Sequence, residues 1–195
     1  MKYLIVTLIS LCWIGCGTKQ ETQAETATTP TEAKPVESIV IQSQSEPDTL
    51  KGSLKAMTTG KIGSTFITIH YYSPAVRGRV IWGGLVPSDQ VWATGAHMAT
   101  AIEFEGSVKI GDQEIPAGKY GFFTIPSSTE WTVILNKNWD QHLTDEYNQQ
   151  DDLVRVVLQP ETLTDHQERL QYAVDSTSII VRWEKIKISL PVFPL

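Results

Sequence analysis

The stretch TFITIHYY at residues 65–72 decides the fold class, because its side chains alternate with a period of two. Ile67, Ile69 and Tyr71 fall on one face of an extended segment, and the more polar Tyr72 falls on the other. An amphipathic helix would instead repeat its apolar positions every 3.6 residues. The stretch therefore predicts a β-strand that buries one face.

The same alternation recurs in four later segments, and a fifth is rich in aromatic and β-branched residues. Turn signals separate them, including IGDQ at 110–113, which suits a hairpin. The sequence predicts an all-β fold, an antiparallel β-sandwich of about 8–11 short strands. We expect strands at 53–58, 65–72, 99–105, 118–125, 131–136, 154–158 and 178–184, with residues 59–63 as a connection after the first.

One segment is predicted to be helical. Residues 139–149 (WDQHLTDEYNQ) are short and polar, so we expect one short surface helix there.

Trp131 and Trp183 lie in alternating segments, and large rings of this kind usually pack in β-sandwich cores. We therefore expect both tryptophans in the core.

The N-terminus has the pattern of an exported protein. Lys2 gives a positive start, and the apolar run from Leu4 to Ile14 is too short to span a membrane, which takes roughly 20 residues. Gly15 before Cys16 resembles the bacterial lipobox, although Trp13 stands where Leu is usual. We expect a signal peptide at 1–15 and lipidation of Cys16.

Residues 17–35 contain no aromatic or large aliphatic side chain, so this segment cannot bury enough apolar area to fold. We expect the lipidated cysteine and a linker at 16–49, with a possible short strand at 38–42, and a sandwich domain at 50–195. The expected location is the bacterial cell envelope, lipid-anchored to the outer membrane and facing the periplasm or the surface. The membrane is then one partner.

Composition limits the chemistry of the domain. After Cys16 the chain has no cysteine, which excludes a disulfide or a thiol nucleophile in the domain. The full chain has 16 basic and 22 acidic residues, a net charge of −6, with no basic stripe, so we expect no nucleic-acid partner. No two histidines stand at a short ligand-like spacing, so we expect no metal and no cofactor.

Several short motifs follow one another along the domain. They are YSP (72–74), VRGR (76–79), WGGLVP (82–87), VWATGA (91–96), IPAGKY (115–120), FTIP (123–126), EWT (130–132) and WEK (183–185). In this order and spacing they resemble the domain-of-unknown-function family 2911, found largely in exported Bacteroidetes proteins. The resemblance covers roughly residues 53–191 and implies no established activity.

The most distinctive segment is irregular and runs from residue 73 to residue 100. The family pattern there is Trp-Arg-x-Gly-Ala, then Asn or Asp, then an acid. This chain has Ala93, His97 and Met98 at the variable places, so a polar site implied by the resemblance would be altered here.

Arginine presents a planar fork that grips carboxylates and phosphates, and loops on a rigid sandwich often bind ligands. The alternative for the two arginines of this segment is that they pair with Glu103 or Glu105 and hold a long loop. The candidate ligand-binding residues are Tyr72, Arg77, Arg79, Trp92, Thr94, His97 and Thr100.

No catalytic residues are assigned, because no nucleophile motif accompanies Ser73, His97 and Glu103. The sequence predicts a non-catalytic domain that binds a small molecule, a glycan or an envelope protein through the 73–100 region. The alternatives are a hydrolase acting on glycans or esters, and a structural module of an envelope assembly. A large exposed apolar patch would favour the module.

Overall fold

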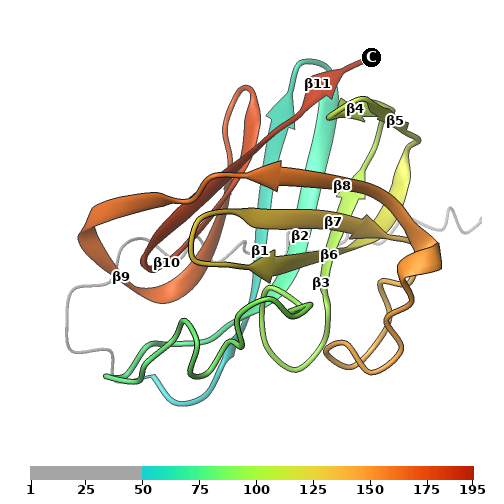
Figure 1. Cartoon of the computed structure of the whole chain (residues 1–195). Helices are drawn as coiled ribbons and strands as arrows, with labels where there is room; N and C mark the ends of the chain where they lie inside the picture. The colour runs from blue at the N-terminus through green and yellow to red at the C-terminus, as the bar shows by residue number, and fades with distance from the viewer. Residues whose placement is uncertain (1–49) are drawn as a thin grey trace, which may run out of the picture. The chain divides into compact units, whose positions relative to one another are not determined.

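The computed structural model describes residues 50–195, which form antiparallel strands joined by turns and irregular loops (Figure 1). A six-stranded sheet has the order β1-β2-β3-β6-β7-β8, β9 pairs with β10, and a three-stranded sheet has the order β11-β4-β5. The strands are β1 (Leu54–Ile62), β2 (Thr65–Ser73), β3 (Thr100–Phe104), β4 (Val108–Ile110), β5 (Gln113–Ile115), β6 (Gly118–Pro126), β7 (Trp131–Asn136), β8 (Asp152–Leu158), β9 (Glu161–Val174), β10 (Ser178–Pro191) and β11 (Phe193–Pro194).

The six-stranded sheet is strongly coiled. In Figure 1 strands β1, β2 and β3 run steeply, whereas β6, β7 and β8 lie nearly horizontal. Right-handed strand twist accumulates in this way across a sheet. The inner face of the sheet, the β9–β10 hairpin and strands β4 and β5 all contribute side chains to one hydrophobic core.

Close approach between β1 and β9 brings the two layers together. A Cβ added at Gly60 would lie 2.4 Å from the Cβ of Val174, so only glycine fits at this crossing. Next to it the rings of Tyr71 and Tyr172 pack with centroids 4.7 Å apart. These contacts join the hairpin to the inner face of the sheet.

The structure confirms the all-β fold and the alternation that predicts it. Ile67, Ile69 and Tyr71 are at most 3% exposed, and Trp131 and Trp183 are buried as expected. The hairpin at 110–113 is also present, with Gly111 in the left-handed region at φ +57°.

Several strands differ from the prediction. Residues 59–62 continue β1 instead of connecting it, because their backbone pairs with β2 as far as Ile62–Thr65. Strand β10 continues to Pro191 and does not end at residue 184, and β9 lies in a polar run that is not among the expected strands. Much of the second half of β9 is buried, and the terminal nitrogens of Arg169 donate there to the carbonyl oxygens of Ser73, Gly52 and Leu50.

The segment expected to be helical, 139–149, is mostly an irregular loop. A single 3-10 turn, η1 (Gln149–Asp151), starts only at its last residue. Leu143 has φ +48°, which breaks a right-handed helix. The Gln141 side chain also bonds backbone groups that a helix would pair with each other. It donates to Asn138 O (2.8 Å) and accepts from Glu146 N (3.1 Å).

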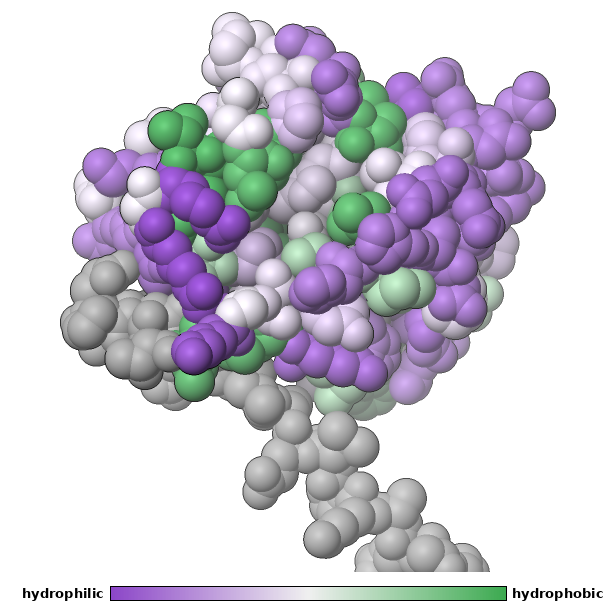
Figure 2. All heavy atoms as spheres, turned by 90° about the horizontal axis from the view of Figure 1, so that it is seen from below, coloured by the Kyte–Doolittle hydropathy of each residue, from purple (hydrophilic) through white to green (hydrophobic). Residues whose placement is uncertain are grey.

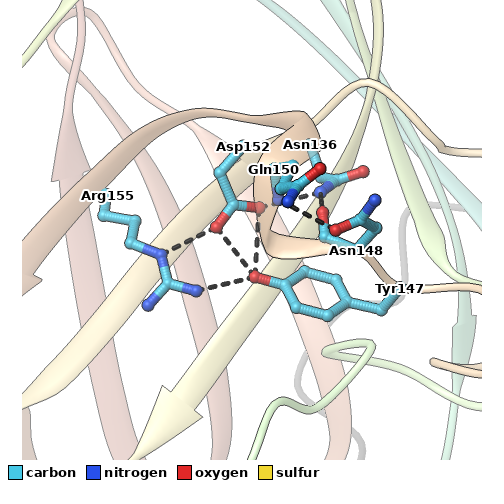
Figure 3. A network of polar contacts seen from close by, with 6 residues as sticks. All are labelled: Asn136, Tyr147, Asn148, Gln150, Asp152 and Arg155. Atoms are coloured by element: carbon cyan, nitrogen blue, oxygen red, sulfur yellow. Dashed lines mark hydrogen bonds and ion pairs between the residues drawn. The ribbon is translucent and has the colours of Figure 1, made fainter.

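A polar network holds this loop against β7 and β8 (Figure 3). The Tyr147 hydroxyl donates to the Asp152 carboxylate at 2.8 Å and accepts from the Arg155 guanidinium at 2.8 Å. Burial and the neighbouring Asp152 raise the pKa of Tyr147 to about 12, so the phenol remains a donor at neutral pH. Asn136, at the end of β7, donates to both Asp152 and the carbonyl oxygen of Asn148.

The signal peptide, Cys16, the linker and the strand expected at 38–42 lie outside the described residues, and the domain boundaries stay predictions. Within residues 50–195 no helix has the length and hydropathy needed to cross a membrane.

Candidate ligand-binding site

The 73–100 segment is irregular, as expected, and its backbone is strained. Of the six non-glycine residues with positive φ in the described chain, four lie here: Arg77, Asp89, Thr94 and His97. Thr94 is the most unusual, since a β-branched residue rarely adopts φ +50°. Such backbone strain persists only where surrounding contacts impose it.

Trp92 belongs to a cluster of four tryptophans in the core. Its ring stacks on Trp183 with centroids 5.7 Å apart and an interplanar angle of 22°, and Trp82 and Trp131 pack edge-on nearby. Its backbone exchanges hydrogen bonds with Thr124 of β6 at 2.7 and 2.9 Å. Trp92 therefore anchors the loop to the sheet.

Thr94 and Thr100 lie in a buried polar network beneath the loop. Both side chains are fully buried. The carbonyl oxygen of Thr94 accepts from Thr100 Oγ1 at 3.0 Å and from the Tyr172 hydroxyl at 2.8 Å. The Thr94 hydroxyl pairs with that of Thr124 at 2.9 Å. Neither threonine offers surface to a ligand in this conformation.

Arg77 and Arg79 hold the loop, but through carbonyl oxygens and not through Glu103 or Glu105. The Arg77 guanidinium donates to Leu50 O, and its backbone N–H donates to Glu168 at 2.8 Å. The Arg79 guanidinium donates to the carbonyl oxygens of Val76 and Ala75. The loop-holding role matches the alternative interpretation, with different partners.

Tyr72 and His97 meet on the face of the six-stranded sheet that lies opposite its inner, core-forming face. We call it the outer face. Their rings pack edge to face with centroids 5.0 Å apart. Tyr72 also lines a hollow of about 340 Å³ on this face, the outer hollow. Sheet residues Lys55, His70, Tyr72, Ala101 and Lys119 line it together with loop residues Met98, Ala99, Trp139 and Asp140.

Strand register explains the shape of the outer hollow. His70, Ala101 and Gly121 stand opposite one another on β2, β3 and β6, so small side chains lie between His70 and the 137–151 loop. A Cβ on Gly121 would lie 3.0 Å from Asn138 O, so glycine lets that loop approach the sheet. Trp139 then covers Lys119, whose Nζ lies 3.8 Å from the ring centroid.

The electrostatics of the outer hollow centre on His70. Burial lowers the pKa of its imidazole, Lys119 and Lys55 lower it further, and Glu103 partly opposes them. The imidazole is thus neutral at pH 7, and the two lysines of the lining outnumber its one carboxylate, that of Asp140. Within residues 50–195 neither lysine forms an ion pair.

A second hollow of about 290 Å³ adjoins the tryptophan cluster. Trp82, Trp131, Pro126 and Pro160 line it, together with the hydroxyl-bearing Ser127 and Ser128. Figure 2 shows the molecule from below, where apolar side chains form separate green areas with polar ones between them. The described part of that face thus lacks the single broad apolar surface expected of a structural module.

The residues considered for hydrolysis are not assembled for it. Ser73 is fully buried, and its hydroxyl donates to Leu170 O at 2.7 Å, whereas His97 packs on Tyr72. In the described chain no group of three or more His, Cys, Asp or Glu side chains is placed to hold a metal ion.

The ligand-binding residues chosen from the sequence do not include five residues that line the outer hollow: Lys55, His70, Lys119, Trp139 and Asp140. An available signal was that His70 and Tyr72 share the outward face of β2. The other residues come together only through cross-strand register and the path of the 137–151 loop, which one sequence does not give.

The fold and the outer hollow define a β-sandwich with a small-molecule-sized cavity on its outer face. The chain belongs to the family described as "Protein of unknown function (DUF2911)", whose model matches residues 53–192. No curated protein and no solved structure matches the chain.

Proposed function

We propose that this chain is a non-catalytic binding protein of the bacterial cell envelope that takes a small ligand in the outer hollow. The observation that carries the proposal is the hollow itself. Its volume lies at the lower end of the range for small-molecule sites, and its lining combines aromatic rings with a few charged groups. Its sheet residues all stand on paired strands, which position side chains more firmly than loops do.

The 73–100 region contributes one rim of this site. Met98 and Ala99 line the hollow, and His97 packs against the lining residue Tyr72. The buried tryptophan and threonines act beneath the rim, where they fix the path of the loop. The proposed binding role thus moves from the loop alone to the junction of the loop with β1, β2, β3 and β6.

The proposed location rests on the N-terminal sequence. A signal peptide ending before Cys16 and lipidation of that cysteine would hold the domain at the outer membrane by a linker of roughly thirty residues. Labelling with a palmitate analogue, in the natural chain and in Cys16→Ser, tests the anchor. Equal labelling of both chains would contradict it.

A binding screen tests the ligand site. The full chain in detergent is screened by thermal shift against small acids, amines, sugars and peptides. Ala101→Leu places a larger side chain on the floor of the hollow and should abolish the shift of any hit. Thr59→Leu adds a comparable side chain at an exposed position of β1 and should leave the shift unchanged. Hits that survive Ala101→Leu, or a screen with no hit, would refute the site.

A further inference from the structure

We propose that the outer hollow binds a small organic carboxylate between Lys55 and Lys119, and that His70 takes up a proton as the carboxylate binds. This inference rests on the proposed function, because it names the class of ligand for the same hollow.

The first support is the position of the two lysines. Lys55 stands on β1 opposite Tyr72, and Lys119 stands on β6 opposite Glu103, so they reach the hollow from its two sides. Strands lie about 4.8 Å apart, and Lys119 is in register with Thr68, four residues along β2 from Tyr72. At about 3.3 Å per residue, these two offsets place the backbones of the two lysines roughly 19 Å from each other. A metabolite-sized anion fits between two long side chains at that separation.

The second support is that both ammonium groups are available. Lys119 is held by the face of Trp139, which attracts a cation without neutralising it. Neither lysine forms an ion pair within residues 50–195. A carboxylate entering the hollow could therefore pair directly with either ammonium group.

The charged and titratable groups around His70 come from every neighbouring element. The positive groups are the two lysines, and the negative groups are the carboxylates of Asp140, which lines the hollow, and of Glu103, which stands opposite Lys119. The rings of Tyr72 and His97 lie on the side of the 73–100 rim. The groups are Lys55 on β1, Tyr72 on β2, Glu103 on β3, Lys119 on β6, Asp140 in the 137–151 loop, and His97 beyond Tyr72.

Proton uptake follows from the sign of these interactions. Burial and the two lysines keep the His70 pKa below its ordinary value, so the free imidazole is neutral at pH 7. A carboxylate beside it stabilises the imidazolium and raises that pKa. By reciprocity, protonation of His70 strengthens carboxylate binding, and affinity increases as the pH falls toward the lowered pKa of the free imidazole. We expect benzoate to bind about tenfold more tightly at pH 5 than at pH 8.

The apolar lining sets the rest of the ligand. Met98, Ala101 and the ring of Trp139 form an uncharged surface beside the lysines. Such a surface suits an aromatic or branched aliphatic body, since an indole ring packs well against another ring. Benzoate is therefore a suitable probe, and benzamide is its uncharged counterpart of nearly equal shape.

The test follows the histidine side chains of the full chain in detergent by ¹H–¹⁵N NMR at several pH values. Benzoate should raise the His70 pKa, and benzamide should not. His166 on β9, paired with Glu168, serves as the internal reference. Lys119→Gln and Lys55→Gln should each raise the His70 pKa of the free protein and weaken its response to benzoate. His70→Gln should remove the tenfold pH effect.

The possible outcomes separate this inference from the proposed function. If both probes perturb the Trp139 indole signal but neither raises the His70 pKa, the hollow binds small molecules and the carboxylate inference is wrong. If benzoate moves His70 and His166 equally, its effect is general and the inference is also wrong. If neither probe perturbs Trp139 or His70, the inference fails, and the Ala101→Leu screen decides the proposed function independently.

Discussion

The carbonyl oxygen of Thr94 allows a quantitative test of how the 73–100 segment is held. It accepts two hydrogen bonds, from Thr100 Oγ1 at 3.0 Å and from the Tyr172 hydroxyl at 2.8 Å. Thr100→Val and Tyr172→Phe each remove one donor with almost no change of shape. Each single variant leaves the carbonyl with one partner, so we expect each to lower the free energy of unfolding by about 1 kcal/mol.

The double variant leaves the buried carbonyl without a donor. An unsatisfied buried polar group costs about 1–3 kcal/mol in desolvation, so the combined loss should be about 3–5 kcal/mol and exceed the sum of the single losses. Urea unfolding followed by tryptophan fluorescence measures all four corners of this cycle. The four-tryptophan cluster adjoining Thr94 makes the signal sensitive to loss of this packing.

Tyr120→Phe is the matched control. The Tyr120 hydroxyl donates to Pro116 O at 2.9 Å, but at an exposed place, so its removal should cost under about 0.5 kcal/mol. Strictly additive losses in the Thr100 and Tyr172 cycle would refute the reasoning. Equal costs for Tyr172→Phe and Tyr120→Phe would refute it as well.

Three further perturbations test other parts of the structure. Gly121→Ala places a Cβ 2.5 Å from the buried Phe123 ring and 3.0 Å from Asn138 O, so it should destabilise the protein by about 1–3 kcal/mol in thermal unfolding. An unchanged midpoint would contradict the close packing around Gly121. Asp175 accepts hydrogen bonds from the backbone N–H groups of residues 177 and 178, which lower its pKa from 3.8. This stabilisation is present above pH 3.8 and is lost as the pH falls through the folded-state pKa. Asp175→Ala should therefore cost about 0.5 kcal/mol at pH 7 and less at pH 2 in urea unfolding, and an equal cost at both would contradict the assignment. The folded-state pKa of His70 is also lowered, which means that the folded state favours the neutral imidazole. The free energy of unfolding is therefore unaffected by His70 above pH 6.5 and decreases as the pH falls from there toward the folded-state pKa. His70→Gln should flatten the stability profile between pH 7 and pH 5, and a profile identical to that of the natural chain would contradict the shift.

The fold could be predicted from the sequence wherever one face of a strand is buried and the other is exposed. Strand β2 illustrates this, since alternation alone identifies its core residues. Strand β9 could not be predicted in this way, because its buried half contains Gln167, Glu168 and Arg169. Charged side chains are almost never fully buried unless they are paired. Arg169 donates to backbone carbonyl oxygens of residues that are about 100 positions away in the sequence, so no local sequence pattern predicts its burial.

The candidate site was predictable only in part, for a related reason. Sequence reasoning selected residues by type within one segment, and the structure distributes them over three environments. Arg77 and Arg79 bond carbonyl oxygens, Trp92 and the threonines are internal, and only Tyr72 and His97 approach the outer hollow. The remaining lining depends on register, which places His70 opposite Ala101 and lets the 137–151 loop complete the wall.

The three departures from the family pattern have different structural meanings. Ala93 is 1% exposed and packs beside Ala99, Phe123 and Ile134, so its small size belongs to the packing of the loop. His97 has φ +61°, a conformation in which Asn, Asp and His are enriched. The backbone at this position therefore suits both the His of this chain and the Asn or Asp of the family pattern. Met98 alone lines the outer hollow. A thioether at a place where the resemblance implies an acid removes negative charge from the rim. Lys55 and Lys119 then outweigh Asp140 in the charge of the lining, which supports the proposal of an anionic ligand.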